Sequence, residues 1–249
     1  MMHARFYAPD AQAPGDLVPL PRDEAEHLAR VLRLGTGDRV RVFNGRGLEF
    51  ISVVEQVGRS AVLVRLEAPS APAPEPTVAI TLVQAVLKGD KMDAVVRDAV
   101  MLGAAAVVPI VTTRTEVSLA ALARGHRVER WQRVAVSSAK QCGRAVVPVV
   151  REPCTFDAVP TAIGKTIPGP GLMLVEPGAS TETMALGDID LARPAEASLL
   201  VGPEGGWTAE EITAARAVCR LISVGRRTLR ADSMAVIGLT AAFTLWKEL

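Results

Sequence analysis

The chain has 249 residues, enough for one large domain or two ordinary ones. Hydrophobic residues make up 49% and charged residues 22%, a balance typical of a globular protein. The net charge of +1 does not by itself indicate a nucleic-acid partner, and no segment reaches the roughly 18 apolar residues expected of a membrane-spanning helix.

The residue types that bind metals are scattered along the chain. No two of the three cysteines form a CxxC pair, and the three histidines have no metal-ligand spacing. We therefore expect no metal site. An odd number of cysteines fits a reducing compartment, and the N-terminal sequence MMHARFYAPD contains no apolar run of the kind found in export signals. Both features predict a cytoplasmic protein.

The first segment, residues 1–70, has the pattern of a small β domain. A helix is predicted over Glu24–Leu34, with Leu28, Val31 and Leu32 on one face. Asn44-Gly45 indicates a tight turn. Short strands are predicted at 17–20, 38–43, 48–57 and 61–66. Several short strands with one helix indicate a small barrel.

A linker follows. Residues 68–76 read APSAPAPEP, with four prolines in nine positions, and such a segment favours an extended spacer over a helix or a central strand. We place the linker at 71–77. A long loop within one domain is the alternative.

The remaining segment, residues 78–249, alternates strands and helices. Apolar runs typical of buried strands occupy 78–85, 105–111, 172–175, 199–201 and 221–224, and helices are predicted at 91–102, 128–140, 209–218 and 233–249. Thr208 and Glu211 have the spacing of a capping box. This order predicts an α/β domain with a parallel sheet.

Basic residues gather in part of this segment. Between Arg114 and Arg151 there are eight Lys/Arg residues against Glu116 and Glu129, a local charge of +6. Arg226, Arg227 and Arg230 form a second cluster. Such patches suit a phosphate backbone, although an ordinary solvated helix face has the same composition.

Two stretches have the pattern of ligand-binding loops. In Leu199–Thr208 an apolar strand ends in the glycine-rich sequence GPEGG before a capped helix, and ligands bind at such carboxyl ends of strands in α/β sheets. A generic glycine-rich turn is the alternative. Ser223–Ser233 also leaves a strand and opens a helix, with Asp232 as a candidate helix N-cap or a functional carboxylate.

These two stretches, in this order, resemble the RsmE family of 16S rRNA (uracil-N3) methyltransferases, which belong to the SPOUT, or trefoil-knot, class. Three further elements are similar to that family: Leu87–Asp93 to its K-G-D-K-M-[ED] element, Gln141–Arg144 to its Q-[CS]-G-R element, and His27–Arg33 to an N-terminal element. The resemblance spans nearly the whole chain.

The resemblance implies a fold, a cofactor and partners. The fold is an N-terminal PUA-like β-barrel that binds RNA, followed by a SPOUT α/β-knot domain with a parallel sheet. The cofactor is S-adenosyl-L-methionine (SAM), bound in the knot of a homodimer. The substrate is N3 of a uridine in 16S rRNA, within the assembled small ribosomal subunit.

The resemblance also maps residues. It implies that two loops and a preceding strand end hold the cofactor, at Leu174, Glu176, Val201, Gly202, Pro203, Glu204, Gly205, Gly206, Val224, Gly225 and Leu229. Candidate RNA contacts are Lys88, Lys91, Arg114, Gln141, Arg144 and Arg226.

The chemistry indicates two catalytic candidates. The attacking N3 must lose its proton, a positioned carboxylate can accept it, and a guanidinium can stabilise charge that develops on the ring oxygens. We hypothesise that Asp232 is the base or orients the substrate, and that Arg230 is its electrostatic partner.

Three elements depart from the family pattern. Thr113 and Lys140 stand where the family has an acidic residue, and Arg230–Ser233 reads R-A-D-S in place of R-T-E-T. These departures are compatible with a substrate geometry, and so a specificity, that differs from the family's. Two other functions stay open: a knotted methyltransferase acting on another RNA target, such as a ribose 2′-hydroxyl of tRNA or rRNA, and a non-catalytic ribosome-assembly factor.

Overall fold

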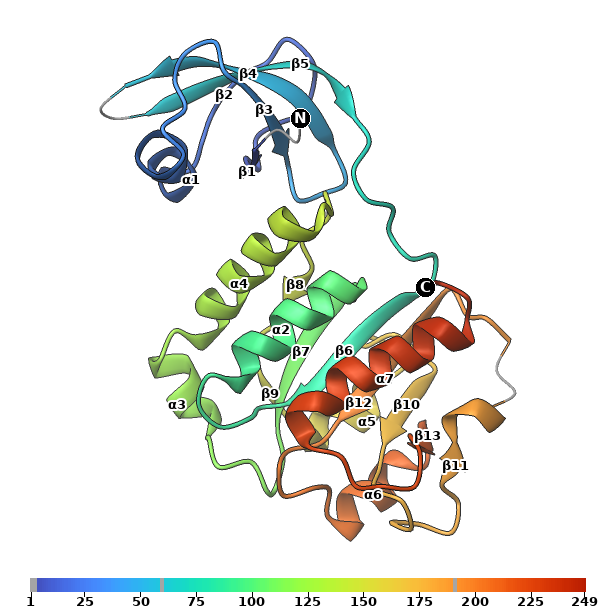
Figure 1. Ribbon diagram of the computed structural model, residues 1–249. Helices are drawn as coiled ribbons and strands as arrows, with labels where there is room; N and C mark the ends of the chain where they lie inside the picture. Colours follow the sequence, from blue (N-terminus) through green and yellow to red (C-terminus); the bar gives the residue numbers. More distant parts are fainter. Residues whose placement is uncertain (1–3, 59–60, 190–191) are drawn as a thin grey trace. The chain divides into compact units, whose positions relative to one another are not determined.

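In the computed structural model, which describes residues 4–58, 61–189 and 192–249, the chain forms two units (Figure 1). The first comprises residues up to Glu75 together with Val136–Val147, and the second comprises Pro76–Ala135 and Pro148–Leu249. The contribution of Val136–Val147 to the first unit was not predicted. Within the described ranges, no helix is long and apolar enough to cross a membrane.

The first unit is built on a five-stranded sheet. Its elements are β1 (Arg5–Tyr7), β2 (Leu17–Pro19), α1 (Arg22–Glu26), a π-helix (His27–Val31), β3 (Arg39–Phe43), β4 (Glu49–Val57) and β5 (Val62–Ser70). The strand order is β1-β3-β4-β5-β2, with β1 parallel to β3 and the other pairs antiparallel. Phe6, Val42, Phe50 and Val64 lie in its buried core.

The predicted helix over Glu24–Leu34 forms, but it runs from Arg22 to Val31 and its second half, His27–Val31, is a π-helix. The N–H of Leu32 donates to the carbonyl of His27, five residues back. This π-type turn adds a residue and breaks the helical spacing. Leu28 is therefore buried, whereas Val31 and Leu32 are 68% and 41% exposed.

Two other parts of the first unit differ from the predictions: the turn at Asn44-Gly45 is longer, and the last strand extends further. The connection at Asn44-Gly45 runs to Leu48, and the Asn44 side chain organises it by accepting bonds from the N–H groups of Arg46 and Leu48. β5 continues to Ser70, into the proline-rich stretch. Pro69 is tolerated because it lies opposite Phe50 of β4 but beyond the Leu63–Arg65 stretch that pairs with β2.

The second unit alternates strands and helices. Its elements are β6 (Ala79–Ala85), α2 (Lys91–Leu102), β7 (Ala106–Val111), α3 (Leu119–Arg124), the first part of α4 (Arg127–Cys142), β8 (Val149–Val150), β9 (Cys154–Thr155), α5 (Val159–Ala162), β10 (Gly171–Leu174), β11 (Met184–Ala185), β12 (Glu196–Val201), α6 (Ala209–Ala215), β13 (Cys219–Ser223) and α7 (Ala231–Leu245).

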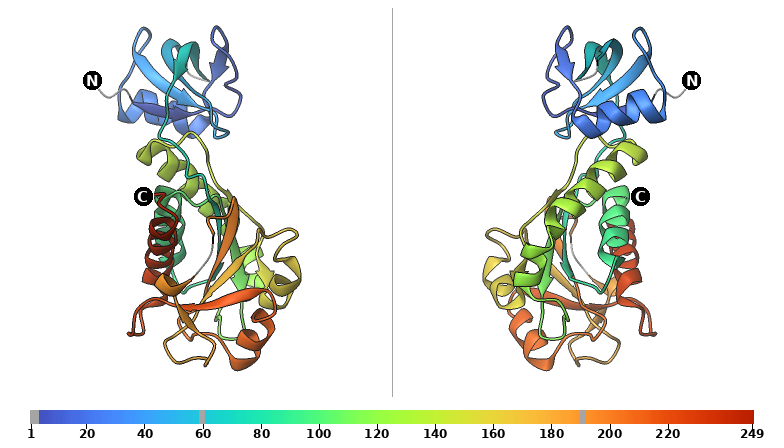
Figure 2. Two further views of the ribbon diagram at one scale, coloured as in Figure 1. Left: turned by 90° about the vertical axis from the view of Figure 1, so that its right-hand side faces the viewer. Right: turned by 90° about the vertical axis from the view of Figure 1, so that its left-hand side faces the viewer.

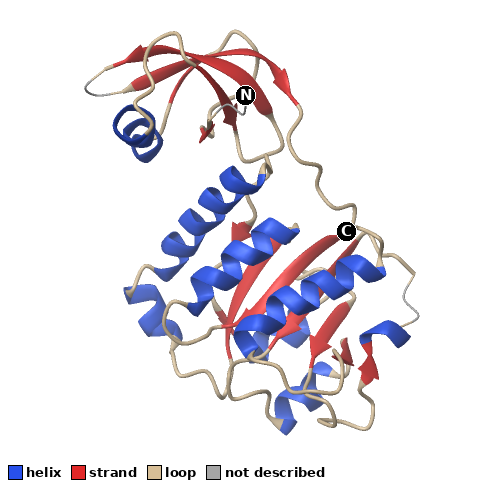
Figure 3. Cartoon of the chain, in the orientation of Figure 1, coloured by secondary structure: helices blue, strands red, loops and turns tan. Residues whose placement is uncertain are grey.

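The strands of the second unit form a parallel sheet in the order β11-β13-β10-β12-β6-β7-β8, with β9 also paired to β7 (Figure 3). Helices cover both faces, α2 and α7 on one and α5 and α6 on the other (Figure 2). Both faces are therefore apolar, which explains the continuous hydrophobic runs of these strands.

The close fit of α7 against the sheet depends on a glycine. A Cβ atom placed on Gly238 would lie 2.5 Å from Leu174 Cδ1 and 3.0 Å from Leu199 Cδ2. On the opposite face, Met173 and Leu200 enter a core cluster that also contains Trp207. Successive residues of β10 and β12 thus pack on opposite faces, as the pleat of a strand requires.

Candidate active site

Three segments meet at one edge of the second unit's sheet. β13, β10 and β12 are adjacent and parallel in the sheet. The segments that follow them therefore begin side by side, at the carboxyl ends of these strands. Together with Lys91 they enclose a cavity of about 400 Å³. The segments that line it lie within 174–177, 201–207 and 224–234. Three stretches far apart in the sequence therefore form one pocket.

Most of the predicted cofactor residues line this cavity. Those that do are Leu174, Glu176, Val201, Gly202, Pro203, Glu204, Gly206, Val224 and Leu229. Gly205 and Gly225 are not among the lining residues. The lining residues that were not named individually are Val175, Pro177, Trp207, Arg227, Thr228, Ala231 and Met234, of which Val175, Arg227 and Thr228 lie within the predicted segments 174–176 and 224–229. Each lies within two positions of a predicted residue, so extending each motif by a few positions would have found them.

The GPEGG loop has a defined conformation. Gly206 has a φ of +68°, which favours glycine, and its N–H donates to the carbonyl of Pro203 at 3.0 Å. The indole Nε1 of the buried Trp207 donates to the carbonyl of Leu174 at 2.8 Å. This bond ties the loop after β12 to the end of β10.

The predicted capping box of α6 is confirmed. The Oγ1 of Thr208 accepts from the N–H of Glu211, and the Glu211 carboxylate accepts from the N–H of Thr208. The second carboxylate oxygen of Glu211 accepts from the N–H of Thr113 at 2.8 Å. Buried Glu211 thus connects the loop after β7 to the loop after β12.

Lys91 and Glu204 form an ion pair at the cavity. Lys91 Nζ lies 2.8 Å from Glu204 Oε1, which also accepts from the N–H of Lys88 at 3.2 Å. Burial tends to raise the pKa of Glu204, but the hydrogen bonds from Lys91 and from backbone N–H groups outweigh it, so that pKa lies below its ordinary value. Glu204 is therefore an anion at neutral pH.

Arg230 and Asp232 form the second ion pair of the cavity. Arg230 donates from Nε at 3.1 Å and from Nη2 at 2.7 Å to the two carboxylate oxygens of Asp232. These hydrogen bonds hold the pKa of Asp232 below its usual range and raise that of Arg230. The helix N-cap is Arg230 and not Asp232. Asp232 lies instead in the first turn of α7, where the helix dipole favours a carboxylate.

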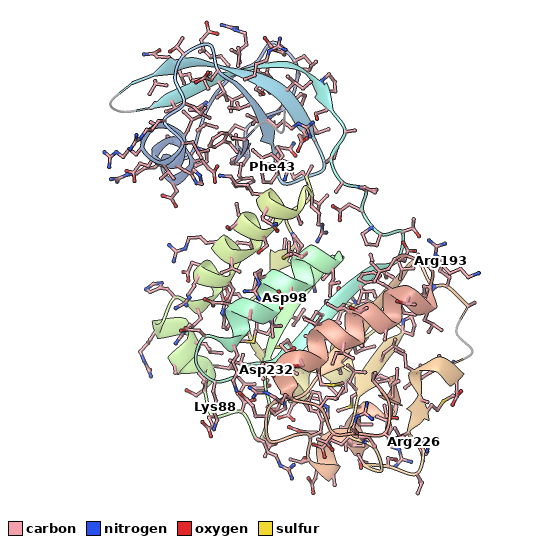
Figure 4. All side chains as sticks on the ribbon, viewed as in Figure 1. Phe43, Lys88, Asp98, Arg193, Arg226 and Asp232 are labelled. Atoms are coloured by element: carbon pink, nitrogen blue, oxygen red, sulfur yellow. The ribbon has the colours of Figure 1, made fainter. Side chains whose placement is uncertain are left out.

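The candidate RNA contacts do not form one group. Lys91 lines the cavity, and exposed Lys88 pairs with Glu116 at 2.5 Å. Exposed Arg226 lies well apart from Lys88 and Asp232 in Figure 4. Arg114 donates to backbone carbonyls of the GPEGG loop.

The last two candidates, Gln141 and Arg144, belong to the first unit. Gln141 is exposed, but Arg144 is buried and its guanidinium pairs with Glu75. Because a buried arginine needs such a partner, Arg144 does not contribute to an exposed basic surface in this structure.

Two family models match the chain, one described as an RNA methyltransferase domain over residues 73–243 and one as an RNA methyltransferase PUA domain over residues 20–67. A ribosomal RNA small subunit methyltransferase E from Synechocystis sp. is 30% identical over 237 residues, which cover 89% of this chain and 71% of the relative. Its counterpart from Rickettsia conorii is 26% identical, with 96% and 94% covered.

Solved structures are similar over almost the whole chain. One is a Legionella pneumophila protein in complex with SAM, with a TM-score of 0.88, 27% identity and 98% of each chain covered. Another is a ribosomal RNA small subunit methyltransferase E from Neisseria gonorrhoeae bound to S-adenosyl methionine. It has a TM-score of 0.86, 27% identity, and 99% of this chain and 98% of that chain covered.

Proposed function

Because the chain belongs to the ribosomal RNA small subunit methyltransferase E family, we propose that it uses SAM to methylate N3 of one uridine in 16S rRNA. The observation that carries this proposal is the cavity formed where three adjacent parallel strands end. Its walls contain the GPEGG loop and the Arg230–Asp232 pair, the two sequence elements that suggested the activity.

The residues of the cavity fit SAM chemically. The cofactor combines an adenosine, whose flat adenine ring has apolar faces, with a cationic sulfonium and an amino-acid end. Leu174, Val201 and Leu229 offer an apolar surface to the adenosine, while carboxylates of Glu176 and Glu204 place negative charge near a cation. When bound, SAM supplies an electrophilic methyl group. These residues bind and orient it.

The Arg230–Asp232 pair suits the acceptor base. A uracil ring presents the N3–H donor between two carbonyl acceptors. The Asp232 carboxylate can accept from N3–H, and Arg230 can stabilise negative charge on the adjacent ring oxygen. Because the pKa of Asp232 is depressed, it is ionised at neutral pH but is a weak base. We therefore favour Asp232 as the group that orients N3–H and accepts its proton as the N3–methyl bond forms and the sulfonium–methyl bond breaks, because N3 becomes a much stronger acid at that point.

This assignment of Asp232 has a direct test. Asp232→Asn removes the charge and keeps the shape, so we expect kcat to fall by about 100-fold while the Kd for SAM changes by less than about threefold, a small fraction of the binding free energy. Single-turnover methylation and calorimetry measure the two quantities. Near-wild-type turnover with intact cofactor binding would exclude the proposed role.

We infer the partners from the same family. The substrate is the small ribosomal subunit, and the first unit is a PUA-like domain that binds RNA. The candidate RNA contacts are Gln141 in the first unit and Lys88 and Arg226 in the second. The enzyme works as a homodimer in the cytoplasm, where ribosomes are assembled. Light scattering of the purified protein tests the dimer, which predicts twice the chain mass of 26.3 kDa.

The proposed reaction is tested with small ribosomal subunits from a strain that lacks this gene. Labelled SAM is added with the protein, and the product is mapped by mass spectrometry. One methyl group on N3 of a single uridine is the expected result. A methyl group on a ribose 2′-hydroxyl would establish another target, and no cofactor binding would favour the assembly-factor function.

A further inference from the structure

Arg114 contacts the GPEGG loop from another part of the sheet. It follows β7, and β7 is separated from β12 by β6. Its Nη1 nevertheless donates to the carbonyl of Gly205 at 2.7 Å and to that of Trp207 at 3.1 Å. One nitrogen atom therefore binds two carbonyls, one on each side of Gly206.

The backbone that carries Arg114 is itself anchored. The N–H of Thr113 donates to Glu211, whose carboxylate also accepts from the N–H of Thr208. Glu211 is buried, and a buried carboxylate with two N–H donors has little freedom to move. Arg114 is thus held at a fixed position relative to the start of α6.

The contact with Arg114 also explains why Gly205 has no side chain. A Cβ atom on Gly205 would lie 3.1 Å from Arg114 Cβ and 3.3 Å from its Cδ. The aliphatic stem of Arg114 occupies the space that a side chain at 205 would need. Of the two adjacent glycines, Gly206 is required by its backbone angle and Gly205 by this stem.

The bonds from Arg114 determine where the loop's N–H groups point. The carbonyl and the N–H of a trans peptide point in opposite directions. With the Gly205 carbonyl held by Arg114, the N–H of Gly206 meets the Pro203 carbonyl and closes the turn. With the Trp207 carbonyl held, the N–H of Thr208 meets Glu211.

We propose that Arg114 is a positioning residue for SAM binding: by holding the carbonyls of Gly205 and Trp207, it fixes the cavity-lining loop 202–207 in its binding conformation. This inference rests on the proposed cofactor site. It assigns Arg114 to the cofactor and removes it from the candidate RNA contacts.

The test compares two arginines of the second unit. Arg114→Ala removes both carbonyl bonds, whereas Arg124→Ala removes the same charge from the last turn of α3. Calorimetric titration of each full-length variant with SAM, without RNA, gives Kd. We expect Kd to rise at least about tenfold for Arg114→Ala, equivalent to about 1.4 kcal/mol, and to stay within about twofold for Arg124→Ala. Equal Kd values in the two variants would overturn the inference.

Steady-state kinetics separate a cofactor role from an RNA role. For Arg114→Ala we expect the KM for SAM to rise, while kcat and the KM for small subunits at saturating SAM stay near wild type. A raised KM for the subunits with an unchanged Kd for SAM would make Arg114 an RNA contact and overturn the proposal.

A conservative variant tests the mechanism by which Arg114 acts. Because a single nitrogen makes both bonds, a lysine ammonium can replace it, and Arg114→Lys should recover most of the SAM affinity. A loss as large as that of alanine would contradict carbonyl binding as the cause. If the wild-type protein itself gave no binding heat with SAM, the proposed cofactor site would be wrong. If the wild-type protein bound SAM normally and Arg114→Ala bound it equally well, only the role of Arg114 would be wrong.

Discussion

At the scale of single residues, the cavity contains paired charges of opposite sign. Lys91 pairs with Glu204 and Arg230 with Asp232, and each carboxylate has a pKa below its ordinary value. The pairs keep both anions ionised throughout the physiological pH range. Arg230 is largely exposed, so a substrate base can reach the pair.

The effect of Arg230 on its partner is testable by titration. Arg230→Gln removes the hydrogen bonds that are the largest cause of the depressed pKa of Asp232, so that pKa should rise toward the ordinary aspartate value. A depressed pKa in the folded state stabilises the fold above the unfolded-state pKa, and this contribution is lost as the pH falls through the folded-state pKa. In the variant the two pKa values are closer, so the contribution at neutral pH should be smaller. Carboxyl ¹³C NMR of the full-length protein measures the shift. An unchanged pKa would mean that Lys91 and Ser233 dominate.

A second residue-scale prediction concerns Trp207. Trp207→Phe keeps a ring in the core but leaves the Leu174 carbonyl without its indole donor, which should cost about 1–3 kcal/mol of unfolding free energy and weaken SAM binding. Trp246→Phe is a matched control, because Trp246 is also buried but its Nε1 has no hydrogen-bond partner among the described residues. Urea denaturation compares them. Equal losses would show that the indole bond contributes nothing.

At the scale of elements, the site depends on how closely α7 approaches the sheet. Gly238 allows this approach, and the side chain that it faces, Leu174, also lines the cavity. The packing of α7 and the shape of the cavity are therefore coupled through one leucine.

This coupling predicts an unusual effect of a glycine substitution. Glycine to alanine inside a helix ordinarily stabilises by about 1 kcal/mol, but at Gly238 the new methyl group meets Leu174 and Leu199. We expect Gly238→Ala to destabilise the protein by about 1–3 kcal/mol and to weaken SAM binding. Thr240→Ala, at an exposed position of the same helix, should do neither. A stabilised Gly238→Ala variant would show that the leucines move aside at little cost.

At the scale of the whole molecule, the two units are not two consecutive pieces of chain. Val136–Val147 belongs to the first unit, and Arg5 explains why. Its guanidinium donates to the carbonyls of Ala139 and Lys140 in the last turn of α4 and of Arg144 just after it, and it pairs with buried Glu49. Terminal helix carbonyls need such donors.

Arg5 is therefore expected to stabilise the first unit strongly. Arg5→Met removes the hydrogen bonds that Arg5 donates to the carboxylate of Glu49, which is 0% exposed. We expect a loss of about 3–5 kcal/mol and faster amide hydrogen exchange at residues 139–144. In the Arg5→Met/Glu49→Gln double variant, part of the loss should return. Hydrogen exchange at 139–144 that matches the wild type would contradict this role.

The sequence predicted what depends on local pattern. The bounds of α2 were predicted exactly, because apolar residues repeat at helical spacing up to Gly103, which adopts a left-handed conformation. The capping box of α6 was also predicted correctly, because it depends on two residues three positions apart. The two-residue strands β8, β9 and β11 were missed, because they are too short to show a period. The bonds from Arg114 and Arg5 were missed for another reason: each joins residues 91 or more positions apart, and no local pattern encodes them.

The strand order has a consequence for the time course of folding. β12 lies between β6 and β10, and β13 lies beyond β10, so an early strand stays unpaired on one side until the last quarter of the chain is available. Pairings between segments so distant in sequence slow folding. On a translating ribosome, β6 must therefore wait for most of the polypeptide to emerge. We expect the cavity to be among the last parts of the chain to form, so that a nascent methyltransferase acquires its cofactor site only when its synthesis is nearly complete.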